Sequence, residues 1–114
     1  MERLVDGRLE TFLEVNPSQH RRNLANVMAP IVAGKLGIPT PRVRFFYRDT
    51  FTTNLGYTYD NEIFVAADLD DMLTLEVIVH EARHLYQHST LFWQTQDQRS
   101  RERDARLYGL AWPR

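Results

Sequence analysis

Three histidines recur at every fourth position in the segment VIVHEARHLYQHS, residues 77–89. Side chains four residues apart on a helix lie one turn above the other, so the imidazoles of His80 and His84 can reach one ion together. Glu81 is offset from this pair by one residue, which holds its carboxylate near a water at the ion without making it a ligand. These residue types at this spacing predict a metal site with a carboxylate base beside it.

The spacing His-Glu-x-x-His is typical of zinc-binding helices in metalloproteases. The alternative is an ordinary helix surface that carries exposed histidines. On a helical wheel, however, Leu73 and Val77 lie on the same side as His80 and His84, while a second apolar stripe lies opposite. Because both sides carry apolar residues, we expect both sides of the helix to be covered by other elements.

Two histidines leave such a site one protein ligand short, because catalytic zinc usually takes three and keeps one position open. His88 cannot complete the set, since eight residues along a helix place it about 12 Å from His80. We expect His88 to be a rim or surface residue, and His20 to be exposed where an earlier helix begins. The third ligand is therefore expected on the last helix of the chain.

Two carboxylates on the last helix compete for this role. Glu102 has the small residues Ala105 and Gly109 on its own side, which would let the two helices approach closely. Asp104 lies on the opposite, more apolar face, where it would need a partner such as the outer nitrogen of a ligand histidine. The spacing favours Glu102 but leaves Asp104, or neither residue, as alternatives.

The segments HEARH and ERDARLYG resemble the minimal zincin metallopeptidases of the ImmA/IrrE type. In that family a His-Glu-x-x-His helix is followed by a helix with a Glu-x-x-Ala motif and an aromatic and a small residue one turn on. The chain departs from the usual family pattern at Arg83 and Arg106. The residues that fit the second motif by position are Glu102, Ala105, Tyr108 and Gly109.

The resemblance implies a zincin-like fold with Zn2+ bound by His80, His84 and Glu102. It also implies that Glu81 is the catalytic base. The function expected on this basis is zinc-dependent hydrolysis of peptide bonds in a protein or peptide substrate, by a metal-activated water. The alternative is a non-catalytic metal-binding or protein-interaction module with a regulatory role.

The substrate is expected to lie extended along an edge of the sheet, with the strand NEIFVAA, residues 61–67, as the candidate for pairing. Its alternative is an edge covered by the protein's own loop. Five residues are conceivable stabilisers of an oxyanion, and none is preferred: Tyr57, Tyr59, Arg83, Tyr86 and Tyr108.

The remaining elements must position these residues, and their order predicts an α+β fold with a small, mostly antiparallel sheet. Asp68 or Asp70 is the expected N-cap of the histidine helix, with Asp71 in its first turn. The predicted elements are a helix from Pro17-Ser18 to Gly37, a strand at 42–48, two strands within 52–67 that turn at Asp60-Asn61, the histidine helix within 67–89, and a last helix within 96–114 that is closed by Pro113.

The chain of 114 residues, 43% hydrophobic and 25% charged, is predicted to form one domain, residues 1–114. It has no cysteine, which excludes disulfides and thiol ligands to zinc. The net charge of -1 gives no general attraction to nucleic acid or anionic lipid, and the arginines of the last helix do not line one face. We expect neither a nucleic-acid nor a membrane partner. The N-terminal 15 residues lack the apolar core of a secretory signal, which predicts a cytoplasmic location.

Overall fold

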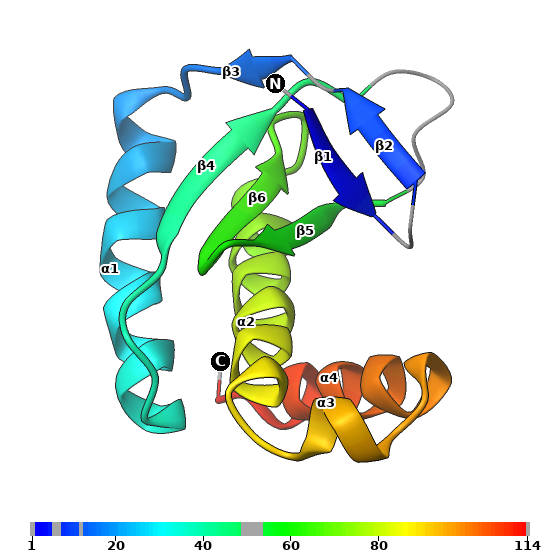
Figure 1. The fold of residues 1–114 in the computed structure, drawn as a ribbon. Coiled ribbons are helices and arrows are strands. Elements are labelled where there is room, and N and C mark those ends of the chain that lie inside the picture. Colours follow the sequence, from blue (N-terminus) through cyan, green and yellow to red (C-terminus); the bar gives the residue numbers. More distant parts are fainter. Residues whose placement is uncertain (1, 6–7, 12, 49–53, 114) are drawn as a thin grey trace.

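The computed structural model describes residues 2–5, 8–11, 13–48 and 54–113, with side chains from residue 13 onward. Helices and strands are mixed along the chain, which confirms the predicted α+β class. The elements are β1 (Glu2–Val5), β2 (Arg8–Thr11), β3 (Glu14–Val15), α1 (Gln19–Leu36), β4 (Arg42–Phe46), β5 (Gly56–Tyr59), β6 (Glu62–Ala66), α2 (Asp71–His88), α3 (Phe92–Thr95) and α4 (Gln98–Ala111) (Figure 1).

Four strands form the sheet beside the helices, in the order β3-β4-β6-β5. The pairs β3–β4 and β5–β6 are antiparallel, whereas β4 and β6 are parallel, so the predicted sheet is mostly antiparallel with a parallel centre. Because β6 lies between β4 and β5, residues 61–67 are not an edge, and that part of the prediction is wrong. The edge strand next to β6 is β5. The strands β1 and β2, which were not predicted, pair with each other and with no other strand of the described residues.

The hairpin between β5 and β6 turns at Asp60 and Asn61, as predicted. Both residues have positive φ, 51° and 61°, and the pair Tyr59 and Glu62 closes the ladder on either side. Two positive-φ residues form the kind of turn whose twist matches that of the flanking strands, and Asp and Asn tolerate this conformation better than other side chains. Thr52 and Thr53, at the start of the predicted strand pair, lie outside the described residues.

Polar caps fix the ends of the long helices. The side chain of Ser18 accepts a hydrogen bond from the Arg21 backbone N–H at the start of α1. Asp70 accepts one from Leu73 at the start of α2, which selects Asp70 over Asp68 as the N-cap. The predicted ends are confirmed too: Gly37 closes α1 in the left-handed conformation, and Pro113 follows α4. The short helix α3 is not predicted.

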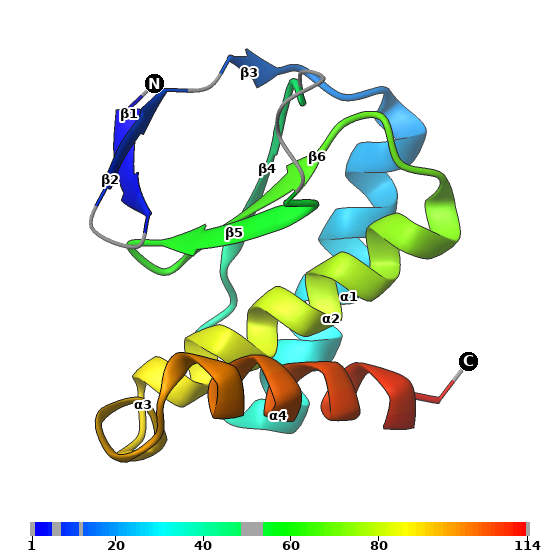
Figure 2. The ribbon, with the colours of Figure 1, turned by 90° about the vertical axis from the view of Figure 1, so that its right-hand side faces the viewer.

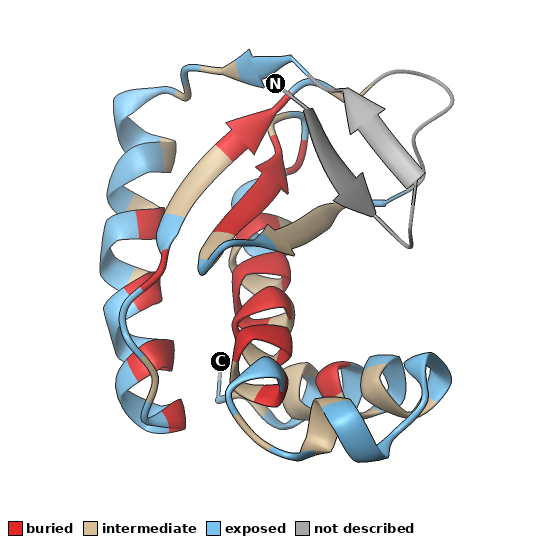
Figure 3. Ribbon diagram, viewed as in Figure 1, coloured by how far each residue is buried: buried red, intermediate tan, exposed pale blue. Residues whose placement is uncertain are grey.

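Helices α1 and α2 lie on the same side of the four-stranded sheet, and α4 crosses the C-terminal part of α2 (Figures 1 and 2). Buried residues gather where these layers meet (Figure 3). Helix α2 contacts α1, α4, β5 and β6, so both of its apolar sides are covered, as predicted. No helix within the described ranges is long and apolar enough to cross a membrane. The cytoplasmic location stays a prediction.

Strand β5 lies directly against α2 at Gly56. A Cβ atom at this position would lie 2.4 Å from Cγ1 of Val77, 3.1 Å from Cγ of Glu81 and 3.1 Å from the Phe64 carbonyl oxygen. Real Cβ atoms do not approach other heavy atoms to 2.4 Å, so only glycine allows this contact. The edge strand is thereby held against the part of α2 that carries Glu81.

Replacing Gly56 tests this contact. We expect Gly56→Ala to lower the free energy of unfolding by about 1–3 kcal/mol, because the strand and Val77 must move apart. Gly34→Ala in α1 is the matched control, since a Cβ there would meet nothing within 4 Å. It should raise the free energy of unfolding by about 0.5–1 kcal/mol, as alanine favours a helix over glycine. Urea denaturation measures both, and shifts of the same sign would contradict the close packing of β5.

Candidate metal centre

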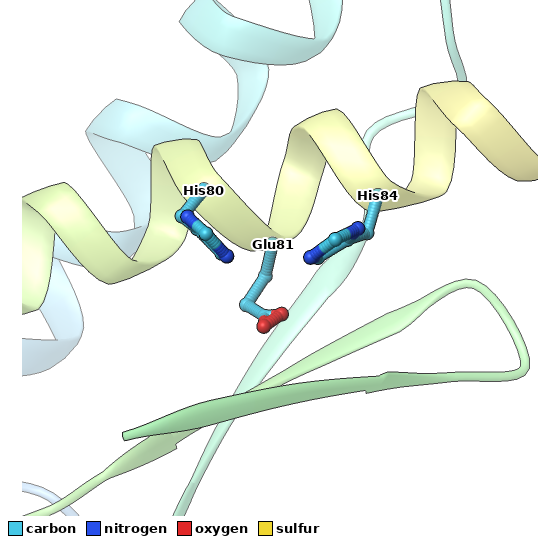
Figure 4. Close-up of side chains that lie close together, drawn as sticks. All are labelled: His80, Glu81 and His84. Atoms are coloured by element: carbon cyan, nitrogen blue, oxygen red, sulfur yellow. The ribbon is translucent and has the colours of Figure 1, made fainter. Parts of the chain in front are cut away.

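Three side chains of α2 gather on the side of the helix that faces β5 (Figure 4). His80, Glu81 and His84 offer ligand atoms that lie within 4.8 Å of one another, so the group could hold a metal ion. Glu81 and His84 are buried, with 6% and 7% of their surfaces exposed, and His80 is partly buried. The alternative of exposed histidines on a helix surface is therefore wrong for this pair.

Glu102 reaches this group from α4. Its Oε2 lies 3.2 Å from Nε2 of His80 and its Oε1 lies 2.9 Å from Nε2 of His84. Ligand atoms about 2.0–2.1 Å from a tetrahedral zinc lie about 3.3–3.4 Å apart. The two imidazoles and the carboxylate thus have nearly the spacing that one small ion requires. That Glu102 is a ligand stays a prediction, but the structure brings it to both histidines.

The close approach of α4 depends on only one of the two small residues considered for it. Ala105 is fully buried, as expected of a side chain packed between helices. A Cβ at Gly109 would meet nothing within 4 Å, so this glycine does not permit the approach and the expectation for it is wrong.

Asp104 lies away from the metal-ligand nitrogens. Its Oδ2 lies 2.8 Å from Nε of Arg83 and its Oδ1 lies 3.2 Å from Nη2 of the same guanidinium. The pKa of Asp104 is lowered chiefly by this hydrogen-bonded guanidinium. The expected direct contact of Asp104 with a histidine is wrong, because a glutamine lies between them.

Gln87 is that glutamine, and it fixes the tautomer of His84. Its Nε2 donates to Oδ2 of Asp104 at 2.8 Å and to the backbone oxygen of Arg101 at 2.9 Å. The amide oxygen of Gln87 therefore faces Nδ1 of His84, 2.9 Å away, and Nδ1 must carry the proton. In the neutral ring, Nε2 is then the atom with a free lone pair, which is the form a metal ligand needs. Gln87 was not predicted as a site residue, although its position three residues after His84 places it on the same helix face.

Nε2 of His84 is buried and has no hydrogen-bond partner among the described residues. The carboxylate oxygen Oε1 of Glu102 lies 2.9 Å from this nitrogen. A buried polar atom without a partner costs about 1–3 kcal/mol, so such atoms are rare unless a ligand satisfies them. This atom, with the oxygens of Glu102 beside it, fits a site for a divalent cation.

The charges of the site favour a positive species between these groups. Contacts with the imidazoles of His80 and His84 hold the pKa of Glu102 far below its usual range. Burial opposes protonation of His84, but the carboxylates of Glu102 and Glu81 outweigh burial and raise the pKa of His84 above its ordinary value. The carboxylates thus attract a proton to the imidazole in the absence of another cation.

A groove of about 1090 Å³ opens over this group, between β5 and α2, and continues to α3 and the first turns of α4. Tyr57 and Tyr59 line it, but Arg83, Tyr86 and Tyr108 do not. Instead the Arg83 guanidinium lies 4.5 Å and 4.8 Å from the ring centres of Tyr86 and Tyr108. Side chains alternate along a strand and Gly56 faces α2, so the side chains of Tyr57 and Tyr59 lie on the other face of the sheet, where the Tyr57 ring contacts Phe46.

The other histidines lie as predicted. His88 is exposed, lines the end of the groove and stacks on Trp93 with 3.4 Å between ring centres. His20 is exposed at the start of α1, where its Nε2 lies 2.8 Å from Oδ2 of Asp71. Neither belongs to the candidate metal centre.

Comparisons of the chain with protein-family models, curated proteins and solved structures find no match. The resemblance to the ImmA/IrrE type therefore rests on its two short motifs. The fold and site define a mixed α+β protein with a His-Glu-His group that could hold a metal ion.

The ion pair of Asp104 with Arg83 predicts a pH-dependent stability. A carboxyl group with a lowered pKa stabilises the folded protein above the ordinary aspartate pKa, about 3.9, and this contribution is lost as the pH falls through the folded value. At pH 7 we expect metal-free Asp104→Asn to be about 1–2 kcal/mol less stable than the unchanged protein. The difference should shrink in urea denaturation as the pH falls below about 3.9. A difference independent of pH would contradict the lowered pKa.

Metal content separates the two carboxylates of α4. With zinc as the probe ion, we expect Glu102→Ala to lose most of the added zinc on dialysis against a weak chelator, because two of the three candidate ligands would remain. Asp104→Ala, whose carboxylate pairs with Arg83, should keep about one ion per chain. Elemental analysis of both proteins, with circular dichroism to verify folding, gives the answer. Zinc loss from folded Asp104→Ala alone would reverse the assignment.

Proposed function

We propose that the protein is a zinc-dependent metallopeptidase with a minimal zincin-like fold of the ImmA/IrrE type. The observation that carries this proposal is the meeting of two helices at the groove floor. The Glu102 carboxylate from α4 lies within 3.2 Å of both imidazoles of α2, and the buried Glu81 lies beside them. This is the residue set that metal-assisted hydrolysis needs: three ligands and a base.

His80, His84 and Glu102 would hold the ion. Two imidazoles with one carboxylate and no thiol favour zinc in a hydrolase. Bound zinc supplies Lewis-acid polarisation of a carbonyl group and activation of a water at neutral pH. Gln87 supports this set, because it orients the His84 ring and leaves Nε2 available.

Glu81 would be the general base. It sits one residue beyond His80, and its carboxylate points to the same side of α2 as both imidazoles (Figure 4). In this role it accepts a proton from the attacking water and then delivers it to the leaving amine, so no covalent intermediate forms on the protein. Burial of Glu81 beneath β5 limits its hydration and keeps it near the reacting groups.

The substrate would be a protein or peptide segment lying extended in the groove. Strand β5 is the sheet edge that borders this groove, so its backbone groups can pair with an added strand. The strand proposed to pair with the substrate is therefore β5 and not β6, which was predicted from the sequence. Tyr57 and Tyr59 belong to the same strand, but their side chains lie on the face of the sheet away from α2, so neither is proposed to stabilise the oxyanion.

A single substitution separates this function from a non-catalytic metal-binding module. We expect Glu81→Gln to bind about one zinc ion per chain but to lose peptide hydrolysis by at least about a hundredfold, since general-base catalysis contributes about 10²–10⁴. Cleavage of a peptide mixture by zinc-loaded protein, followed by mass spectrometry, measures the loss. The control is His20→Gln, at the start of α1 and outside the candidate metal centre, and this variant should cleave peptides normally. Equal behaviour of Glu81→Gln and unchanged protein toward every peptide would refute the proposal.

A further inference from the structure

One arginine lines the groove beyond the metal centre. Arg101, in the first turn of α4, is the only arginine or lysine among the described residues that border the groove. Trp93 and His88 line the same end. His88 is one helical turn, about 6 Å, beyond His84 along α2, which corresponds to about two residues of an extended peptide.

The Arg101 side chain is held in place without a carboxylate partner among the described residues. Its guanidinium carbon lies 4.0 Å from the centre of the Trp93 ring. Nη1 donates to the backbone oxygen of Gln96 at 2.6 Å and lies 3.4 Å from that of Trp93. These contacts fix the side chain against α3 and leave Nε and Nη2 without a hydrogen-bond partner in the described part of the chain.

Two other arginines with fixed side chains have a carboxylate partner. Arg83 pairs with Asp104, and Arg44 pairs with Glu14. Arg101 forms no ion pair with a carboxylate among the described residues. The pKa of the nearby Asp97 is lowered chiefly by hydrogen bonds with Ser100, and the Arg101 guanidinium adds a smaller effect. A cation that is fixed in a groove wall and lacks a carboxylate partner is preorganised for an anionic ligand.

We propose that Arg101 is a specificity-determining residue that binds a substrate carboxylate about two residues from the scissile bond. The inference rests on the proposed peptidase function and names its substrate class: peptides with an acidic side chain, or with a free C-terminal carboxylate, at this position. The carboxylate would accept hydrogen bonds from Nε and Nη2, the two donors of Arg101 that face no protein acceptor. The Trp93 ring holds the guanidinium in place by a cation–π contact.

Paired peptides test the inference with zinc-loaded protein. The first pairs differ by Glu or Gln at each position within three residues of the scissile bond, and the second by a free or amidated C-terminus. We expect one type of pair to show a preference of about 10- to 100-fold in kcat/KM for the carboxylate form. A preference in the Glu/Gln pairs identifies a side chain, and one in the C-terminal pairs identifies a chain end. No preference in either set would overturn the inference.

Variants of Arg101 assign such a preference to this side chain. Arg101→Gln should abolish the preference in kcat/KM for the carboxylate peptide. Arg101→Lys should keep part of this preference, and Arg101→Glu should favour a Lys-bearing peptide. Gln87 contacts Arg101 through the backbone oxygen and not through the side chain, so these variants keep that contact. Arg103→Gln, an exposed residue of α4 outside the groove, is the matched control and should keep the preference. A preference that survives Arg101→Gln would overturn the inference.

A binding measurement separates failure of this inference from failure of the peptidase proposal. If the zinc-loaded protein cleaves no peptide, the proposed function fails, and Trp93 fluorescence in a Trp112→Phe background then reports binding of the same pairs. The carboxylate form should bind about 10- to 100-fold more tightly than its neutral partner, and only where Arg101 is present. Equal binding of both forms would overturn the carboxylate site by itself.

Discussion

The side-chain amide of Gln87 joins the two helices that build the candidate metal centre. It is fully buried in α2, donates to Asp104 and to the Arg101 backbone of α4, and accepts from His84. An amide has distinct donor and acceptor ends, so the acceptors on α4 fix which end meets the imidazole. The same contacts that dock α4 therefore set the protonation of His84. Docking also brings Glu102 to the histidines, so helix packing and ligand geometry depend on one buried group.

The distribution of charge follows from this docking. With neutral imidazoles, Glu81 and Glu102 leave the site with the charge of two carboxylates, which a divalent ion would balance. Arg83 lies between the two histidines in sequence, yet it does not line the groove, because its guanidinium pairs with Asp104 and contacts two aromatic rings. Its difference from the usual ImmA/IrrE pattern thus places no cation at the metal centre. Residues adjacent in sequence serve different faces of the helix.

Local signals in the sequence predicted much of the fold. The Ser18 and Asp70 caps, the Asp60-Asn61 turn and the edge-to-face contact of His80 with His84 each depend on residues within a few positions of one another. The place of β6 inside the sheet could not be predicted this way. It depends on parallel pairing of β6 with β4, and β5 separates these two strands in the sequence. The contact of Gly56 with Val77 could not be predicted either, because it also joins residues that are far apart in the sequence. Glycine in a strand has several explanations, and only the packed structure selects one.

The apolar residues on the histidine side of α2 are explained by β5. Val77 is buried beneath Gly56, and Leu73 lines the same groove as the ligand candidates. Strand β5 thus shields Glu81 from water on the face that packs against α2. Its other edge pairs with no strand of the four-stranded sheet, so backbone groups stay available there. A wider spacing would hydrate the carboxylate, and a covered edge would remove the place where an extended chain could pair. The closeness of β5 to α2 is therefore the feature that allows a chain of 114 residues to combine a sheltered carboxylate with an open groove.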